Sequence, residues 1–523
     1  MAASMSAETP ESPVGHSIQS PLDLFVIGGG INGAGIARDA AGRGLRVALC
    51  EKDDLAQGTS SRSGKLIHGG LRYLEYYEFR LVREALIERE VLLESAPHII
   101  WPMRFLLPHS PADRPAWLIR LGLFLYDHLG GRKRLPGTRV VNLQSGIEGE
   151  PLHDQFIKGF EYSDCWVDDS RLVVLNALDA SERGAAIMPR TAFEHAERVN
   201  NLWKITVECK HTGQRDFYAR ALVNAAGPWV NHVIDNIDGS SSTRSVRLVK
   251  GSHIVVKKFW QGEHAYLLQN ADKRVIFVNP YEQHYALIGT TDIPHQGVPQ
   301  SATVESSETD YLIKTVNRYF RKTLSADDIV YSYTGVRPLY DDDTENPSAV
   351  TRDYTFDLDS AENQAPLLSV FGGKITTFRK LAEQAMERIR PYIAHCESSW
   401  TSGQKLPGGD FPDADFEAFL QSVTAKYPWL DSRTARHLAH AFGTRIHRVI
   451  GSASNTDDLG KQFSEIFYAQ EAVYLLQHEW AETADDILFR RSKHGLHMSD
   501  LQRRNFERWL SGYLATEQHA HPG

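Results

Sequence analysis

The sequence has few of the features that mark metal-binding, secreted, membrane-spanning or nucleic-acid-binding proteins. Its 523 residues include four cysteines without a C-x-x-C pair, which favours free thiols in a reducing compartment over disulfides or a cysteine zinc site. The formal net charge is −9 at pH 7 and no long basic block occurs, so nucleic-acid binding is disfavoured. No apolar run reaches the roughly 18 residues that cross a bilayer.

Length and the first residues set further expectations. A chain of 523 residues is too long for one small hydrophobic core, so two or three domains are expected. Residues 1–20 contain neither an apolar segment nor arginine, so we expect a flexible tail rather than a secretory signal or a mitochondrial presequence. No metal-ligand spacing occurs, because the cluster Asp341–Asp343 lacks the alternation and the glycine of a calcium loop.

The densest signal lies in residues 23–54. An apolar run is followed by G-x-G-x-x-G at Gly28, Gly30 and Gly33, then by a helical stretch and a second apolar run that ends at Glu51. The glycines allow a tight turn and a close approach to a pyrophosphate, the helix start offers free N–H groups, and the acid can bind a ribose. This order predicts an adenine dinucleotide site, and the alternative is a glycine-rich turn in an ordinary α/β domain.

Two later segments repeat the form of strand, glycine and helix. They reach Gly227 and the pair Gly372-Gly373. Three helix starts suit an extended ligand with several negative charges, whereas nicotinamide enzymes usually need only the first. A flavin makes use of the third, because a helix N-terminus near the pyrimidine end stabilises the charge of the reduced ring. The pattern therefore predicts a flavin dinucleotide.

The rest of the chain gives a coarser outline. Residues 58–75 form a loop rich in hydrogen-bonding side chains, residues 245–340 are rich in β-like runs and predict an antiparallel sheet, and the pattern from about 400 is helical. Residues 115–135 crowd apolar side chains before Arg132-Lys133-Arg134. They predict either a helix at a membrane surface or a buried helix with a solvated basic turn. His195, His211 and the C-terminal histidines are expected at the surface.

Over residues 20–515 the sequence resembles the bacterial FAD-dependent, aerobic respiratory glycerol-3-phosphate dehydrogenases. The motifs that carry this resemblance are GGGINGAGIARDAAGRGL, SSRSGKLIHGGLRYLE, FEYSDCWVDD, KGSHIVV, IGTTD, TGVRPL and SVFGGKITTFRKLAE. It implies an α/β fold with a Rossmann-like FAD domain of the glutathione-reductase or D-amino-acid-oxidase type, an inserted antiparallel substrate-binding sheet and a C-terminal all-helical domain.

The implied domain boundaries follow from that fold. They are a tail at 1–20, FAD-binding segments at about 21–98, 170–240 and 345–395, substrate-binding segments at about 99–169 and 241–344, and a helical domain at 396–523.

The resemblance also implies an activity. It is oxidation of sn-glycerol 3-phosphate to dihydroxyacetone phosphate, with hydride passing from C2 to flavin N5 and electrons passing to a membrane quinone. The implied location is cytoplasmic, peripherally bound to the inner face of the cytoplasmic membrane, with a homodimer left open. The alternatives are an oxidase that uses O₂, an amino-acid oxidase of similar fold, and an FAD-containing membrane scaffold without turnover.

The site residues implied by the resemblance fall into two groups. The flavin contacts are Gly28, Gly30, Gly33, Glu51, Thr59, Ser60, Ser61, Lys65, His68, Gly69, Gly227, Gly373 and Thr376. The substrate residues are Arg72, Tyr73, His253, Arg337, Arg352 and Lys374. Gly64 departs from the family pattern, where a serine is expected.

The residue types suit a phosphate dianion that carries a secondary alcohol. Arg72, Arg337 and Arg352 can bind the phosphate, because guanidinium matches phosphate oxygens bidentately, and Tyr73 adds an O–H donor. His253 is the expected base, although a core histidine on a strand is the alternative. Arg337 or Lys374 would stabilise the developing alkoxide. For each cation, an ordinary ion pair or a structural place is the alternative.

Overall fold

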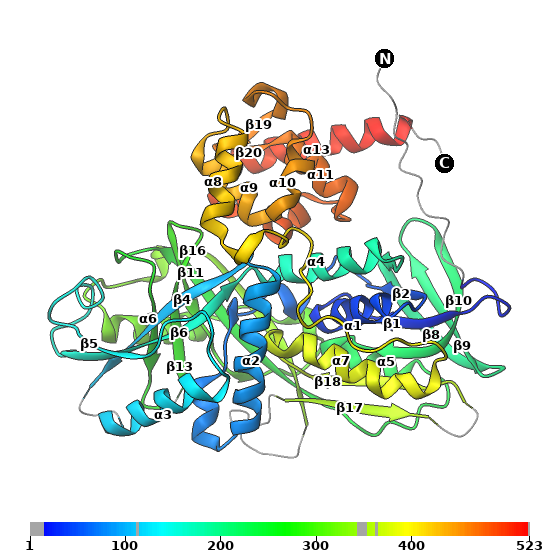
Figure 1. Cartoon of the computed structure of the whole chain (residues 1–523), viewed down its shortest axis with the longest axis horizontal. Coiled ribbons are helices and arrows are strands. Elements are labelled where there is room, and N and C mark those ends of the chain that lie inside the picture. The colour runs from blue at the N-terminus through cyan, green and yellow to red at the C-terminus, as the bar shows by residue number, and fades with distance from the viewer. Residues whose placement is uncertain (1–14, 111–113, 273, 342–352, 361–363, 521–523) are drawn as a thin grey trace. The chain divides into compact units, whose positions relative to one another are not determined.

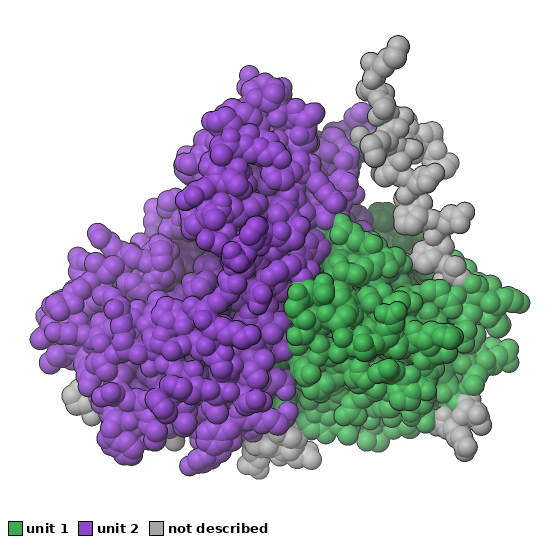
Figure 2. Space-filling model, viewed as in Figure 1, with its two compact units in different colours: residues 1–60, 173–247, 338–404 green, residues 61–172, 248–337, 405–523 purple. Residues whose placement is uncertain are grey.

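The computed structural model of the chain describes residues 15–110, 114–272, 274–341, 353–360 and 364–520 (Figure 1). These residues form two compact units built from alternating segments (Figure 2). Unit 1 comprises Met1–Ser60, Val173–Arg247 and Pro338–Gln404, and unit 2 comprises Ser61–Leu172, Leu248–Arg337 and Lys405–Gly523. Residues 61–98 belong to unit 2, although the sequence placed them with the FAD-binding segments. The C-terminal region also belongs to unit 2.

Unit 1 is built on a largely parallel sheet, as expected for a dinucleotide-binding fold. Its eight strands include the path β17-β18-β10-β1-β2-β7, and β8 and β9 extend from β10. The pairs β18–β10, β10–β1, β1–β2 and β2–β7 are parallel. Central strand β1 is buried at nearly every position, which explains its unbroken apolar sequence. The α/β prediction is confirmed.

The elements of unit 1 have the following bounds. The strands are β1 (Leu22–Ile27), β2 (Val47–Cys50), β7 (Ala186–Met188), β8 (Thr191–Val199), β9 (Leu202–Cys209), β10 (Gly213–Asn224), β17 (Tyr354–Asp359) and β18 (Leu367–Gly372). The helices are α1 (Ile31–Gly42), α4 (Asp169–Glu182, whose first residues belong to unit 2), α5 (Val230–Asp235) and α7 (Phe378–Ile389).

Unit 2 contains the sheet that the β-rich middle of the sequence predicts. Its ten strands include the path β15-β11-β14-β13-β12-β4-β6-β3, with β16 beside β11 and β5 beside β6. Pairs such as β11–β14, β12–β13 and β4–β6 are antiparallel, whereas β12 and β4 run parallel. Strands β3 to β6 come from before residue 170, so the sheet joins distant parts of the chain.

The bounds of this sheet and its helices are as follows. The strands are β3 (Leu66–Ile67), β4 (Ile100–His109), β5 (Arg139–Asn142), β6 (Lys158–Val167), β11 (Val246–Lys257), β12 (Ala265–Gln269), β13 (Val275–Tyr281), β14 (Tyr285–Gly289), β15 (Ile293–Pro294) and β16 (Ile329–Tyr340). The helices are α2 (Phe79–Ser95), α3 (Ala116–Leu129) and α6 (Ser306–Tyr319).

The C-terminal region of unit 2 has a hydrophobic core of its own. Phe442, Phe467 and Phe506 are all fully buried in it. The region consists of α8 (Phe416–Lys426), α9 (Ser432–Phe442), α10 (Ile446–Ile450), α11 (Ala469–His478), α12 (His494–His497) and α13 (Asp500–Ala520). A short hairpin, β19 (Gln462–Ser464) with β20 (Phe467–Tyr468), adds strands to a region predicted as all-helical.

Helix α3 carries apolar side chains on two faces. Leu123 and Tyr126 are buried, whereas Trp117 is 67% exposed, Leu121 47% and Phe124 56%. The three exposed positions are spaced four and three residues apart, so they share one face. Of the two expectations for this segment, the fully buried helix is wrong. None of the helices among the described residues is long and apolar enough to cross a bilayer.

Candidate functional site

The first glycine turn of unit 1 leaves no room for side chains. Gly28 has φ +109°, and a Cβ there would lie 2.6 Å from the carbonyl oxygen of Ala225. A Cβ on Gly33 would overlap the carbonyl oxygen of Gly28. Gly30 is the N-cap residue of α1. The turn therefore packs against the end of β10 while presenting the start of α1, which is the arrangement that a pyrophosphate requires.

Glu51 closes this turn from the end of β2. Its carboxylate accepts from the amide of Gly29 at 2.7 Å and from the amide of Asp53 at 2.9 Å. Burial raises the pKa of the Glu51 carboxyl, although both amide donors lower it. Glu51 thus fixes the turn geometry, and it stands where an acid that binds ribose is expected.

The other glycine turns of unit 1 meet the first one. Nδ2 of Asn32 donates to the carbonyl oxygen of Gly372 at 3.2 Å. A Cβ on Gly373, which has φ +103°, would lie 3.1 Å from the same nitrogen. Gly227, with φ +56°, begins a short 3-10 helix three residues after β10 ends at Asn224. The structure therefore gathers all three strand–glycine–helix segments at the carboxyl edge of one sheet.

The remaining unit 1 residues predicted to bind flavin lie near these turns. Ser60 Oγ accepts from the amide of Ile31 at 3.0 Å, at the start of α1. Thr59 lies in the same 3-10 turn, and Thr376 is buried in the 3-10 turn Ile375–Thr377 that precedes α7. Among the described residues, Oδ1 of Asn32 and Nε1 of Trp229 are buried without a hydrogen-bond partner. Glycine turns with buried polar atoms that have no partner within the described residues fit a dinucleotide.

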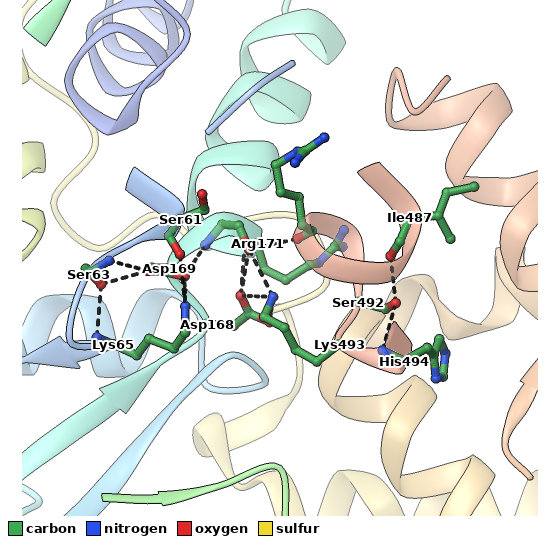
Figure 3. A network of polar contacts seen from close by, with 12 residues as sticks. Ser61, Ser63, Lys65, Asp168, Asp169, Arg171, Ile487, Ser492, Lys493 and His494 are labelled. Carbon is green, nitrogen blue, oxygen red and sulfur yellow. Dashed lines mark hydrogen bonds and ion pairs between the residues drawn. The ribbon is translucent and has the colours of Figure 1, made fainter. Parts of the chain in front are cut away.

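In unit 2 the loop that follows residue 60 is held by one buried ion pair (Figure 3). Nζ of Lys65 lies 2.7 Å from Oδ1 of Asp169 and donates to the carbonyl oxygen of Ser61 at 3.2 Å. Oδ2 of Asp169 accepts from the hydroxyl of Ser63 at 2.7 Å. Lys65 has φ +56°, a backbone conformation that is uncommon outside glycine. The ion pair with Asp169 thus fixes the position of Lys65, and thereby the course of the loop that contains it.

His253 is the buried imidazole of the unit 2 sheet. It is 3% exposed on β11, and its ring stacks on Tyr333 with centroids 4.9 Å apart. Burial lowers the pKa of His253 well below 6.5, and Arg337 and Lys65 lower it further. Within the described residues its Nδ1 has no hydrogen-bond partner. The ring is therefore neutral near pH 7 and can accept a proton.

Gly64 lies next to this imidazole. A Cβ on Gly64 would stand 3.7 Å from Nε2 of His253. The serine that the family pattern leads one to expect at this position would therefore bring a hydroxyl toward His253. Glycine leaves that space open beside the ring.

Arg337 is paired within unit 2. Its guanidinium makes an ion pair with Asp292 and donates to Oγ1 of Thr290 at 3.0 Å. Its side chain is 26% exposed, so it is not fully buried. A Cβ on Gly251 would overlap the guanidinium. An ion pair was the alternative to substrate binding for this arginine, and that ion pair is present. It orients the guanidinium, and the side chain remains partly exposed.

The other predicted residues occupy distinct places. Arg72 is half-buried, and its guanidinium donates to the Tyr76 hydroxyl at 3.3 Å. The ring of Tyr73 fills the space that a Cβ on Gly70 would take. The His68 ring lies 6.2 Å from that of Phe277.

The amide of Gly69 donates to the Tyr126 hydroxyl at 2.8 Å. Lys374, in unit 1, is the N-cap residue before Ile375–Thr377. Arg352 lies outside the described residues.

Three residues of this arrangement were not predicted. Asp169 was quoted only within a motif, although a buried lysine needs a counterion. Tyr333 stacks on His253 and donates to the carbonyl oxygen of Ser63 at 2.8 Å. Asn32 was taken as a spacer in the glycine fingerprint. The charge of Lys65 indicates only that a counterion is needed, and it does not identify Asp169.

Comparison with known proteins gives a consistent set of similarities. A family model described as FAD dependent oxidoreductase matches residues 23–356. A second model, described as the C-terminal domain of alpha-glycerophosphate oxidase, matches residues 399–509.

Individual proteins are similar along nearly the whole chain. A D-erythritol 1-phosphate dehydrogenase of Brucella abortus is 60% identical over 93% of this chain and 97% of its own. An aerobic glycerol-3-phosphate dehydrogenase of Escherichia coli K12 is 50% identical over 94% of this chain and 97% of its own. The crystal structure of a Bacillus halodurans glycerol-3-phosphate dehydrogenase with FAD is 26% identical with a TM-score of 0.72, and covers 94% of both chains.

Proposed function

This chain belongs to the FAD-dependent oxidoreductase family that includes the glycerol-3-phosphate dehydrogenases, and from that premise we propose that it oxidises sn-glycerol 3-phosphate to dihydroxyacetone phosphate. The observation that carries the proposal, beyond family membership, is the neutral buried His253 with two cations near it. A proton acceptor beside positive charge suits the oxidation of an alcohol that carries a phosphate.

FAD is the cofactor, and its binding falls to the glycine turns of unit 1. When bound, FAD accepts the hydride that leaves the carbinol carbon. Gly28, Gly33 and Gly373 give it backbone surface free of side chains, and Asn32 and Trp229 offer polar atoms that have no other partner among the described residues. Glu51 holds the first turn in shape and offers its carboxylate to the ribose.

His253 takes the hydroxyl proton. A base must be unprotonated before the reaction, and the burial of His253 ensures this at neutral pH. The stacked Tyr333 fixes the plane of the ring. Arg337 and Lys65, whose charges act on His253, favour the alkoxide that forms as the proton leaves. Arg337, held by Asp292 and partly exposed, also binds the phosphate dianion.

The electrons pass on to a quinone at the inner face of the cytoplasmic membrane, where the protein binds peripherally. The exposed face of α3 supports this part of the proposal. Its side chains Trp117, Leu121 and Phe124 are exposed. Another exposed aromatic, Tyr77, is 80% exposed and directly follows the 3-10 helix Leu71–Tyr76, which contacts α3. Exposed large apolar side chains on one helix face are typical of proteins that insert into the headgroup region.

A second substrate is favoured by a specific observation. The Brucella abortus relative named D-erythritol 1-phosphate dehydrogenase is 60% identical, against 50% for the Escherichia coli aerobic glycerol-3-phosphate dehydrogenase. Erythritol 1-phosphate is one carbon and one hydroxyl longer than glycerol 3-phosphate, so the same phosphate-binding cations and the same base could serve both. The difference would lie in the space around the extra hydroxymethyl group.

One anaerobic experiment tests the proposal. The purified holoprotein is mixed with glycerol 3-phosphate or with D-erythritol 1-phosphate, and loss of the visible flavin band is followed in time. A soluble quinone is then added. Bleaching by glycerol 3-phosphate and recovery with quinone are the expected results.

The other outcomes separate the alternatives. Bleaching by D-erythritol 1-phosphate but not by glycerol 3-phosphate would identify the longer polyol phosphate as the substrate. Recovery in air as rapid as with quinone would indicate an oxidase. A flavin band that neither compound changes would reject a polyol phosphate dehydrogenase altogether.

A further inference from the structure

Three side chains of the C-terminal region converge at one buried point. His437 comes from α9, Glu471 from α11 and His494 from α12. Nε2 of His437 lies 2.9 Å from Oε1 of Glu471, and Nε2 of His494 lies 3.2 Å from each carboxylate oxygen. One ligand atom from each residue fits within 4.8 Å of the other two. Two imidazole nitrogens and a carboxylate thus face a common centre.

The cluster is buried but reachable from one side. The side chains of Glu471 and His494 are 3% and 2% exposed, whereas that of His437 is 18% exposed. His494 also stacks on Phe467, with ring centroids 4.2 Å apart. This corrects the expectation that the C-terminal histidines lie at the surface. His437 is the most exposed of the three side chains.

The charges of the cluster favour a cation. The carboxylate of Glu471 is 3% exposed and lies within hydrogen-bond distance of both imidazoles. A second carboxylate, that of Glu282, lies 3.7 Å from Nε2 of His497, three residues after His494.

The nitrogen–oxygen spacings of the triad are close to those of a coordination sphere. Zinc binds imidazole nitrogen at about 2.0–2.1 Å and carboxylate oxygen at about 2.0–2.2 Å, so neighbouring ligand atoms of a tetrahedral site stand about 3.4 Å apart. The nitrogen–oxygen distances of 2.9 and 3.2 Å need little adjustment to reach that value. Two histidines and one carboxylate suit zinc and its first-row neighbours better than magnesium or calcium, which prefer oxygen.

We propose that His437, Glu471 and His494 bind one divalent transition-metal ion, with zinc as the probe. The ion would connect helices α9, α11 and α12 and stabilise their packing. Water would complete its coordination from the side of His437. The competing arrangement is a purely hydrogen-bonded triad, in which both imidazoles donate to Glu471. The residues are separated by 34 and 23 positions, which matches no zinc signature in sequence.

The test uses the full-length holoprotein, stripped with a chelator and then dialysed against micromolar zinc. Metal per chain is measured by mass spectrometry for the wild type, His437→Gln and His494→Gln. Glutamine can still donate a hydrogen bond to Glu471, so the packing is kept while the imidazole ligand is lost. His478→Gln is the matched control, because His478 is exposed on the same helix as Glu471.

The expected result is one retained zinc in the wild type and the control, and a loss of at least tenfold in affinity in each ligand variant. Zinc should also raise the unfolding temperature of the wild type by a few degrees. X-ray absorption of the zinc-loaded wild type, which depends on no variant, should show two imidazoles and one carboxylate. Zinc retention equal in the wild type and both variants, or none in the wild type, would leave only the hydrogen-bonded triad.

Discussion

Lys65 and Asp169, which are 104 residues apart, form a buried ion pair of 2.7 Å in which neither side chain is more than 2% exposed. The residue before Asp169 faces a different partner, because Asp168 lies 3.2 Å from Nζ of Lys493 (Figure 3). Two consecutive carboxylates at the start of α4 thus hold the loop of Lys65 and the segment before α12. The position of that loop is thereby linked to the C-terminal region.

Replacing Asp169 with Asn should loosen the loop of Lys65. The change leaves a buried ammonium without its counterion, which costs about 3–5 kcal/mol when a buried pair is broken on one side. We expect lower stability in urea and less flavin per purified chain. The double variant Asp169→Asn/Lys65→Met should recover stability but not flavin content. Unchanged urea stability in the single variant would mean that the pair contributes nothing.

Replacing His253 with Gln should remove the proton acceptor. Glutamine keeps the size of the side chain and cannot take a proton, so kcat should fall about 100- to 10,000-fold. Stopped-flow bleaching by the substrate measures this step directly. Flavin content should not change. Tyr333→Phe is the control, since it keeps the stacked ring beside His253 and loses only the hydrogen bond to Ser63. A kcat within threefold of the wild type would exclude His253 as the base.

The glycine turns show how far the sequence predicts the site. Gly28, Gly227 and Gly373 were predicted to serve one ligand, and the structure brings their turns together, because each signal is local and each follows a strand of the same sheet. Their flavin contacts remain predictions. Helix α3 could not be decided from sequence. An apolar helix has the same periodicity whether its second face meets the core or a membrane.

Partners that are distant in the chain account for most of what was missed. Nothing near Arg337 in the sequence indicates Asp292, which reaches it across the sheet from beyond β14. The pairing of Lys65 with Asp169 depends in the same way on β3 lying beside β6. Such contacts follow from strand order. In a sheet assembled from discontinuous segments, strand order cannot be deduced from any single stretch of residues.

Replacing Arg337 with Gln should weaken substrate binding and change the pH dependence. Losing charged donors to the phosphate should raise KM about 10- to 100-fold. The positive charge of Arg337 lowers the pKa of His253, so its removal should raise that pKa. His253 is active when neutral, so kcat is lost as pH falls through its pKa. The acidic limb of kcat should therefore move to higher pH in the variant.

Arg247→Gln is the matched control for that measurement. Arg247 pairs with Asp341 at 2.9 Å, and its side chain is 26% exposed, as is that of Arg337. It should leave KM and the acidic limb unchanged. A raised KM in Arg337→Gln with no shift of the acidic limb of kcat would mean that Arg337 binds the phosphate but does not affect the pKa of His253. A normal KM for both variants would remove Arg337 from the substrate site.

Replacing Trp117 and Phe124 with Ser should weaken membrane binding. Both side chains are more than half exposed on α3, so their loss should not destabilise the core. Insertion of two large aromatics contributes several kcal/mol at most, and we expect binding to anionic vesicles to weaken by at least tenfold. Flotation with vesicles measures this, and activity with a soluble quinone analogue should remain.

The basic residues after α3 allow the electrostatic part of this binding to be separated. Lys133 is exposed, whereas Arg132 lies 3.3 Å from Asp127 and Arg134 donates to the carbonyl oxygen of Asp413. Replacing all three with Gln should weaken binding to anionic vesicles and have little effect on neutral ones. If the aromatic variant floats as well as the wild type, α3 is not the membrane surface, and its exposed face must serve another contact.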